Sequence, residues 1–292
     1  MVNGNDRGNM LRPKVLKSHI VSSVEEVLQS LGLSGVAYKL HEKAKALDPF
    51  VMWRNLSYYA AGKAKDGLPI PPGSLRNMVC GTYDIGWFLR SGYLAAESVA
   101  KVLKKAGVDF NDFRAMLDFG CGCGRVVRHL RSLADKSEIH CCDPNQVLVK
   151  WGKENLGFAS FQTNAPLPPL DFPDKKFDFI YSVSVFTHFP ERLQMIWINE
   201  LSRVLRTGGF LLLTVHGMGH LKRLNADQQR AFLDGSLVVK EGKYVGSNLC
   251  RAYHPEDFVR KRLARGWAIV EFIPDGLRGE PPQDAWLLRK HA

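Results

Sequence analysis

Three glycines at alternate positions follow a short apolar run that contains an acid. The stretch is MLDFGCGCGR, residues 116–125, in which Asp118 precedes Gly120 by two residues and Gly122 and Gly124 follow. A glycine-rich turn between a strand and a helix lets a ligand approach the backbone closely, and its free N–H groups favour polar or anionic ligand groups. We therefore expect a cofactor-binding turn at the edge of an open α/β sheet.

The spacing of the glycines separates this turn from two common nucleotide-binding loops. A dinucleotide fingerprint G-x-G-x-x-G would need a glycine where Arg125 stands, which argues against an NAD-dependent oxidoreductase. The phosphate-binding pattern G-x-x-x-x-G-K-[ST] is absent. The turn therefore predicts a ligand that does not require a pyrophosphate.

Two acids next to the turn indicate what the ligand carries. Asp118 can pair with an ammonium group, because a carboxylate forms charge-assisted hydrogen bonds with cations. Asp143 comes 23 residues after Gly120, at the end of the next predicted strand. An acid in that place accepts hydrogen bonds from ribose hydroxyls. Together the acids predict a ligand with an amino-acid-like cation and a ribose.

The elements that must position these residues alternate between strands and helices. This alternation predicts a mostly parallel sheet covered on both faces. The predicted strands are 115–119, 138–142, 158–162, 177–183 and 210–215, and the helices between them are 125–133, 145–155 and 191–205.

The regions before and after this core have a different pattern. Residues 15–62 have helical periodicity, the Pro- and Gly-rich stretch 67–73 is a linker, and 92–105 is an amphipathic helix. We predict a helical N-terminal cap over residues 1–75 and a second domain over 76–292. Within that domain, residues 217–253 form an insertion with a polar helix and a hairpin around Gly242, and a helix and two closing strands (268–273 and 284–290) follow.

The combined motifs resemble the class I S-adenosylmethionine-dependent methyltransferases. The resemblance rests on D-x-G-x-G-x-G, the acid after the second strand, FDFIYSVSVFTHF in fourth-strand position and LRTGGFLLLTVHG, and it covers residues 76–216 best. It implies an α/β, Rossmann-like fold with a seven-stranded, mostly parallel sheet whose last strand is antiparallel. It also implies S-adenosyl-L-methionine as the cofactor.

The resemblance further implies a set of cofactor contacts. Asp118, Gly120 and Gly122 would hold the methionine end, and Gly124 would let the next helix start close by. Asp143 would bind the ribose, and an aromatic of the segment 81–92, Tyr83 or Trp87, would lie near the sulfonium. The other implied contacts are Pro144 and Asn145 against the adenine, Asn164 and Ala165 at its amino group, and Ser182 and Val183 beside the methyl.

Three histidines are candidates for a general base. A neutral oxygen or nitrogen nucleophile must lose a proton during methyl transfer, and histidine is suited to accept it. His216 ends the fifth predicted strand and His188 follows the fourth, both at the sheet edge where ligands bind. His254, before the helix that follows the insertion, is a weaker candidate. For each of them a packing or capping role remains the alternative.

Charge and cysteine content limit the environment and the partners. The 292 residues carry a net charge of +11, which suits an acidic partner such as nucleic acid or an anionic substrate. The six cysteines lack the C-x2-C spacing of zinc sites, so we predict no metal site. The start has no secretory signal pattern, and no apolar run approaches the ~18 residues that a membrane span needs, so we expect a cytoplasmic protein.

Missing motifs narrow the methyl acceptor. No N-P-P-Y, D-P-P-Y or Pro-Cys motif of nucleobase methylation is present, and no acidic pair of the protein-arginine type follows the fourth strand. These absences favour O-methylation of a small molecule, a sugar or another glycan-type acceptor. An RNA methyltransferase, favoured by the net charge, and an inactive partner subunit that binds the cofactor stay as alternatives. The sequence does not predict the oligomeric state.

Overall fold

The computed structural model describes residues 46–240, 250–279 and 282–291, and it divides the chain into two compact units, residues 1–56 and 57–292. Of the smaller unit, the structure describes residues 46–56, which include the first part of α3 (Pro49–Ala61). α3 confirms helix at the end of the predicted stretch 15–62, whose residues 15–45 lie outside the described residues. The predicted domain boundary between residues 75 and 76 stays a prediction.

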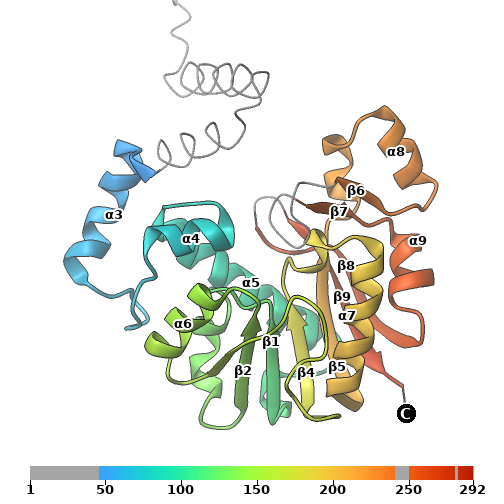
Figure 1. Ribbon diagram of the computed structural model, residues 1–292, viewed down its shortest axis with the longest axis horizontal. Coiled ribbons are helices and arrows are strands. Elements are labelled where there is room, and N and C mark those ends of the chain that lie inside the picture. The colour runs from blue at the N-terminus through green and yellow to red at the C-terminus, as the bar shows by residue number, and fades with distance from the viewer. Residues whose placement is uncertain (1–45, 241–249, 280–281, 292) are drawn as a thin grey trace, which may run out of the picture. The chain divides into compact units, whose positions relative to one another are not determined.

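A seven-stranded sheet is the centre of the larger unit (Figure 1). Its order is β3-β2-β1-β4-β5-β9-β8, with parallel pairing from β3 to β5 and antiparallel pairing of β9 with both β5 and β8. The predicted Rossmann-like sheet with an antiparallel last strand is therefore confirmed. The strands are β1 (Ala115–Phe119), β2 (Glu138–Asp143), β3 (Ser160–Thr163), β4 (Phe177–Ser182), β5 (Leu205–Val215), β8 (Trp267–Leu277) and β9 (Gln283–Lys290).

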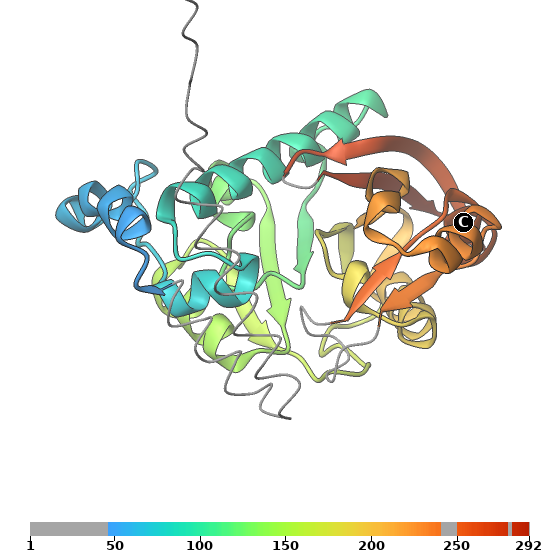
Figure 2. The same cartoon turned by 90° about the horizontal axis from the view of Figure 1, so that it is seen from above.

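Two hydrophobic cores cover the two faces of the sheet. Alternate residues of β1 divide between them, since Met116 belongs to one core and Leu117 to the other. The first core includes α5 (Ile85–Lys105), η2 (Val127–Leu133) and α6 (Gln146–Asn155), and the second includes α7 (Glu191–Val204), α9 (Glu256–Phe258) and η5 (Val259–Leu263). Figure 2 shows α5 along one face and α7 on the other side of the sheet.

Several element boundaries differ from the sequence predictions. α5 begins at Ile85 rather than Gly92, because Asp84 caps it by accepting a hydrogen bond from the Trp87 N–H. The stretch 125–133 contains a 3-10 helix, η2, rather than the predicted α-helix. β5 begins at Leu205 rather than Phe210, and Gly208 takes a φ of 74° within it, where the pairing with β4 is irregular.

A second, small sheet forms part of the predicted insertion. β6 (Val238–Lys240) pairs antiparallel with β7 (Arg251–Tyr253), which confirms a hairpin whose predicted turn at Gly242 lies outside the described residues. The polar helix is α8 (Ala226–Leu233), which follows the 3-10 helix η4 (Met218–Arg223). No helix in the described ranges combines the length and apolar character of a membrane span.

Candidate functional site

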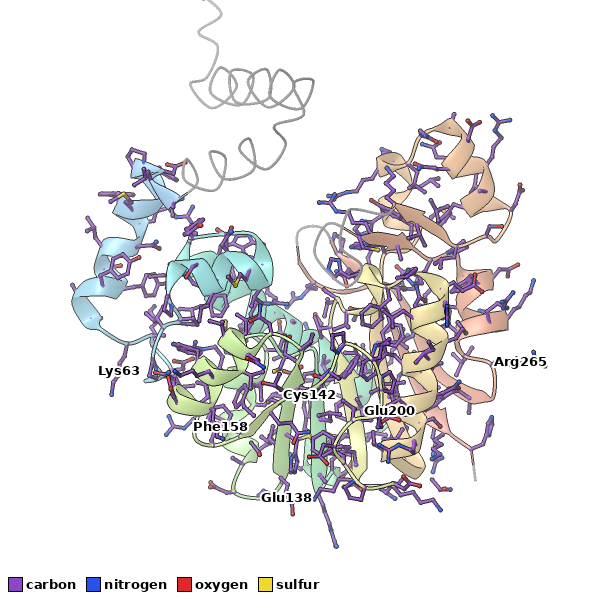
Figure 3. The ribbon with its side chains drawn as sticks, viewed as in Figure 1. Lys63, Glu138, Cys142, Phe158, Glu200 and Arg265 are labelled. Atoms are coloured by element: carbon purple, nitrogen blue, oxygen red, sulfur yellow. The ribbon has the colours of Figure 1, made fainter. Side chains whose placement is uncertain are left out.

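The glycine turn leaves β1 at the carboxyl edge of the sheet. Figure 3 labels Glu138 and Cys142 toward opposite ends of β2, and the Cys142 carbonyl accepts hydrogen bonds from the N–H groups of Gly120 (2.9 Å) and Cys121 (3.1 Å). Gly120 has a φ of 80°, and a Cβ on it would lie 2.2 Å from Val185. The glycine is therefore required both by its backbone conformation and by the close approach of the Val185 side chain, which follows β4.

A short helix that the sequence analysis did not predict covers this turn. The helix is α4 (Gly73–Cys80), and its Val79 side chain would lie 2.7 Å from a Cβ placed on Gly122. On the same helix, the Met78 sulfur lies 4.0 Å from the Asn145 side-chain nitrogen. Residues 73–80, which include the predicted boundary between residues 75 and 76, therefore cover the turn.

Tyr83 lies in the loop between α4 and α5. A Cβ on Gly73 would come within 2.9 Å of its ring, and its carbonyl accepts a hydrogen bond of 2.6 Å from Arg76 Nη2. These contacts pack Tyr83 against the start of α4. Its predicted place beside a sulfonium stays a prediction.

Asp143 ends β2, and the backbone orients its carboxylate. Its Oδ2 accepts from the Gly122 N–H (3.0 Å) and its Oδ1 from the Asn145 N–H (2.9 Å). Burial raises the pKa of Asp143, and these two hydrogen bonds lower it. Each carboxylate oxygen can accept more than one hydrogen bond, so both can also accept from ribose hydroxyls. Asn145 itself caps α6, because its Oδ1 accepts from the N–H groups of Val147 and Leu148.

Asp118 lies deeper, between two neighbouring strands. It is 2% exposed and is in register with Cys141 on β2 and Tyr181 on β4. Burial raises the pKa of Asp118 to about 7, while the Tyr181 hydroxyl and the Arg125 charge lower it. Its Oδ2 makes no hydrogen bond of normal geometry to the described residues. A buried acceptor without a donor is unfavourable, so this oxygen is suited to a ligand cation.

Two other predicted cofactor residues also have a buried polar atom without a partner among the described residues. They are Asn164, through Oδ1, and Ser182, through Oγ. The Asn164 side-chain nitrogen donates to the Ala165 carbonyl at 2.7 Å, which leaves the oxygen as the free acceptor. With Asp118, these atoms lie at or next to the carboxyl ends of β1, β3 and β4. Unsatisfied groups at the edge where α/β sheets bind ligands fit a cofactor with several polar groups.

The predicted bases His188 and His216 both lie against β7. The Nδ1 atom of His188 is 2.8 Å from the Cys250 carbonyl oxygen, and that of His216 is 3.2 Å from the Ala252 carbonyl oxygen. A carbonyl only accepts, so each Nδ1 carries the proton and each Nε2 carries a lone pair. Burial lowers the pKa of both, for His216 to about 2. Both imidazoles are therefore neutral at pH 7 with a lone pair on Nε2, and the burial that keeps them neutral also makes them weaker bases than a histidine in water.

His220, which the sequence analysis missed, lies against His216 with ring centroids 4.2 Å apart and the rings tilted by 35°. Its Nε2 donates to the Pro282 carbonyl oxygen at 2.7 Å. His254 is next to His216 along the backbone, because its backbone N–H donates to the His216 carbonyl. Burial lowers the pKa of the His254 side chain to about 3. The four-residue spacing of His216 and His220 was a signal that could have identified His220. Its hydrogen bond to Pro282 joins residues 62 apart and could not be predicted from local sequence.

The sequence analysis also missed a hydrogen-bonded group at the end of β4. Ser184 takes a φ of 64°, which is rare for residues other than glycine. Its N–H donates to Thr214 Oγ1 (2.8 Å), and its Oγ accepts from Gln283 Nε2 (2.8 Å). Thr214 donates to Gln283 Oε1 at 2.7 Å, which fixes the orientation of that amide. β5 and β9 together therefore determine the conformation of this loop.

Comparison with known proteins agrees with this geometry. Residues 117–213 match the model of a family described as a methyltransferase domain. This part of the chain is a class I methyltransferase domain. The match begins in β1 and ends in β5, so it contains the glycine turn, Asp118, Asp143 and Ser184. The predicted family is thus confirmed, and S-adenosylmethionine is the cofactor of that family.

Curated relatives share this domain with different acceptors. The chain is 27% identical over 145 residues to the tRNA N(3)-cytidine methyltransferase METTL2 of Gallus gallus, covering 45% of this chain and 39% of that protein. It is 28% identical over 138 residues to the malonyl-acyl-carrier-protein O-methyltransferase of Legionella pneumophila, covering 44% of this chain and 48% of that protein. The chain thus spans less than half the length of these relatives.

A solved structure supports the fold. A chain of the complex that contains the Haloferax volcanii Trm112 methyltransferase activator superimposes with a TM-score of 0.51 and 13% identity. The superposition covers 75% of this chain and 99% of that one.

Proposed function

We propose that the protein transfers a methyl group from S-adenosylmethionine to a hydroxyl oxygen of a small molecule or sugar. When bound, this cofactor supplies a methyl group on a sulfonium, which is ready for direct displacement. The observation that supports an oxygen acceptor is the pair of neutral imidazoles, His188 and His216, whose Nε2 lone pairs can accept a hydroxyl proton.

The chain's own residues divide the work of binding. Asp143 orients the ribose, Asp118 holds the ammonium of the methionine part, and Asn164 Oδ1 accepts from the adenine amino group. α4 covers the turn and helps to exclude water. The acceptor then lies near the ends of β4 and β5, where His216 removes its proton.

An RNA acceptor is the second candidate, and charge in the predicted insertion favours it. The positive charge of Arg223 lowers the pKa of His220, and that of Arg251 lowers the pKa of His188, so both cations lie close to the histidines. Lys222 adds a further basic residue in η4. Basic residues beside a reactive site favour a phosphate backbone. The tRNA relatives agree with this candidate.

The test is a transfer assay with methyl-tritiated S-adenosylmethionine and three acceptor classes. These are bulk tRNA, a malonyl thioester and a panel of methyl glycosides with free hydroxyls. Label in a glycoside or in another small oxygen acceptor supports the proposal. Label in tRNA, suppressed by salt, selects the RNA candidate. Cofactor binding without transfer to any class would favour the inactive partner subunit.

A further inference from the structure

Two cations lie directly opposite each other in the small sheet of the insertion. Lys240 ends β6 and is the register partner of Arg251, which begins β7. Residues directly opposite in an antiparallel pair point to the same face, and like charges in these positions repel each other. Neither side chain forms an ion pair with an acid among the described residues. The two charges therefore destabilise this short sheet, and an anion bound between them would relieve the repulsion.

The contacts of Lys240 leave its charge uncompensated. Its Nζ donates to the Arg223 carbonyl at 2.6 Å and lies 5.7 Å from the centre of the Tyr253 ring. A carbonyl and an aromatic ring orient an ammonium group without cancelling its charge. Arg223, at the end of η4, is an exposed third cation, and its positive charge lowers the pKa of His220. Three positive charges from η4, β6 and β7 therefore lie in one part of the insertion.

Cations of the helices that precede and follow the small sheet are paired with acids. α8 has one cation and η5 has three, and each of them forms an ion pair. The pairs are Arg230 with Asp227 (2.5 Å), Arg260 with Glu256 (2.7 Å), Lys261 with Asp257 (2.7 Å) and Arg262 with Glu191 (2.6 Å). By comparison, unpaired positive charge is concentrated in the small sheet and at the end of η4. This concentration fits one anionic group better than a long polyanion, which needs a continuous track of free cations.

One aromatic ring connects these cations to the candidate base. The centre of the Tyr253 ring lies 5.4 Å from that of His216, and the two residues also form a backbone bridge. Tyr253 is two residues after Arg251 on β7, so both point to the same face of the small sheet. The positive charge of Arg251 also lowers the pKa of His188. A ligand held by the cations can therefore place another of its groups near the histidines.

We propose that Lys240 and Arg251 bind a phosphate group of a small-molecule methyl acceptor and thereby hold its hydroxyl near His216. This inference rests on the proposed function and adds the substrate class, a phosphorylated sugar or a similar small phosphate ester. The guanidinium of Arg251 can form two parallel hydrogen bonds to phosphate oxygens, and the ammonium of Lys240 adds a point charge. Arg223 strengthens the positive field around the phosphate.

The test is calorimetric titration of phosphate probes into the full chain, with and without S-adenosylhomocysteine. The probes are inorganic phosphate and glucose 6-phosphate, and glucose is the neutral counterpart. Arg251→Gln and Lys240→Gln each remove one charge of the opposed pair. Arg230→Gln is the matched control, because it removes the same charge from an exposed residue of α8 that is paired with Asp227.

We expect both phosphate probes to bind the unchanged protein and glucose to give no binding heat. Arg251→Gln and Lys240→Gln should each weaken phosphate binding by roughly 10-fold, the lower end of the loss for a hydrogen bond to a charged group, because both side chains are accessible to solvent. Arg230→Gln should change it by less than about 2-fold. Without phosphate, Arg251→Gln should unfold at a higher urea concentration than the unchanged protein, because it removes the repulsion between like charges.

The outcomes separate this inference from the proposed function. Equal weakening by all three variants would show that phosphate responds only to net charge and would overturn the inference. No phosphate binding together with binding of S-adenosylhomocysteine would overturn the inference and leave the proposed function standing. Phosphate binding without any binding of S-adenosylhomocysteine would reject the proposed function and, with it, the role of the cations in holding an acceptor.

A short single-stranded RNA is the last probe. If it binds at least roughly 100-fold more tightly than glucose 6-phosphate, and Arg251→Gln abolishes this difference, the acceptor is RNA and the small phosphate ester is excluded. If its binding is unaffected by Arg251→Gln while that of glucose 6-phosphate is weakened, the small acceptor is supported.

Discussion

The cofactor edge and the acceptor edge of the sheet are prepared by burial in opposite senses. At the cofactor edge, formed by the glycine turn with Asp118 and Asp143, burial raises the pKa of two acids. At the acceptor edge, formed by His188, His216, His220 and His254, burial lowers the pKa of four bases. Burial therefore favours the neutral form of the side chains at both edges, compared with the same groups in water.

The consequence differs between the two edges. A ligand cation or a hydroxyl donor stabilises the charged form of the acids at the cofactor edge, so these acids favour binding. The histidines of the acceptor edge are neutral with a lone pair, so they can accept a proton but do not attract an anion. One edge is therefore suited to hold a zwitterionic nucleoside, and the other is suited to activate a hydroxyl.

The largest expected effect is on the shape of the cofactor edge. Gly120→Ala would place a Cβ 2.2 Å from Val185, and we expect a loss of S-adenosylhomocysteine affinity of roughly 100-fold or more. Gly107→Ala is the matched control, because Gly107 also has a positive φ, 73°, but no atom lies within 4 Å of its Cβ position. Equal affinity in the two variants by calorimetry would contradict the steric argument.

The next effect belongs to the acceptor edge. We expect His216→Ala to lower the turnover number by roughly 100-fold, the lower end of the contribution of a general base, because burial weakens His216 as a base, with unchanged cofactor affinity. The control is His140→Ala on β2, whose ring nitrogen lies 3.4 Å from a Glu138 oxygen, away from the glycine turn. Because the pKa of His216 is about 2, its titration should not reduce the rate between pH 8 and pH 5. A rate that falls by half near pH 6.5 in the unchanged protein and not in the variant would disagree.

Asp118 links binding to stability. Its folded pKa of about 7 exceeds the unfolded value of ~3.9, so its ionisation reduces stability as the pH rises from about 4 to 7. We compare the free energy of unfolding of Asp118→Asn with that of the unchanged protein. We expect the difference to favour the variant by roughly 1–3 kcal/mol more at pH 8 than at pH 4. The same variant should nevertheless bind S-adenosylhomocysteine more weakly. Urea unfolding at both pH values tests this, and a variant less stable than the parent at pH 8 would refute it.

The smallest effect concerns the loop between the two edges. Ser184→Ala and Ser184→Gly both remove the hydroxyl that accepts from Gln283, but only glycine adopts a φ of 64° without strain. We expect the glycine variant to be the more stable of the two by about 1 kcal/mol in urea unfolding. The reverse order would mean that the loop relaxes out of this conformation once the hydroxyl is lost.

Contiguous features explain why the cofactor edge was predictable. Asp118, the glycines and Asp143 lie within one strand-turn-helix-strand unit, so their spacing in sequence determines their spacing in space. β1 was predicted with its observed bounds for the same reason, since its five buried residues are four apolar side chains and Asp118.

The acceptor edge was predicted only in part, because its contacts join distant segments. His188 binds a carbonyl 62 residues away, and Gln283 reaches Ser184 over 99 residues. α4 was missed because its eight residues, GSLRNMVC, directly follow a Pro-rich stretch that was predicted to be a linker. α5 was predicted to begin at Gly92, but this glycine lies inside the helix, where the Arg125 carbonyl oxygen would be 2.1 Å from a Cβ.

The central claim is that the cofactor edge binds S-adenosylmethionine through Asp143 and the glycine turn. Calorimetric titration of S-adenosylhomocysteine into the unchanged protein and into Asp143→Ala tests it most directly. The account predicts micromolar binding to the first and at least roughly 30-fold weaker binding to the second, because the variant loses the ribose contacts and the support of Gly122. Equal affinities, or no binding heat with the unchanged protein, would contradict it.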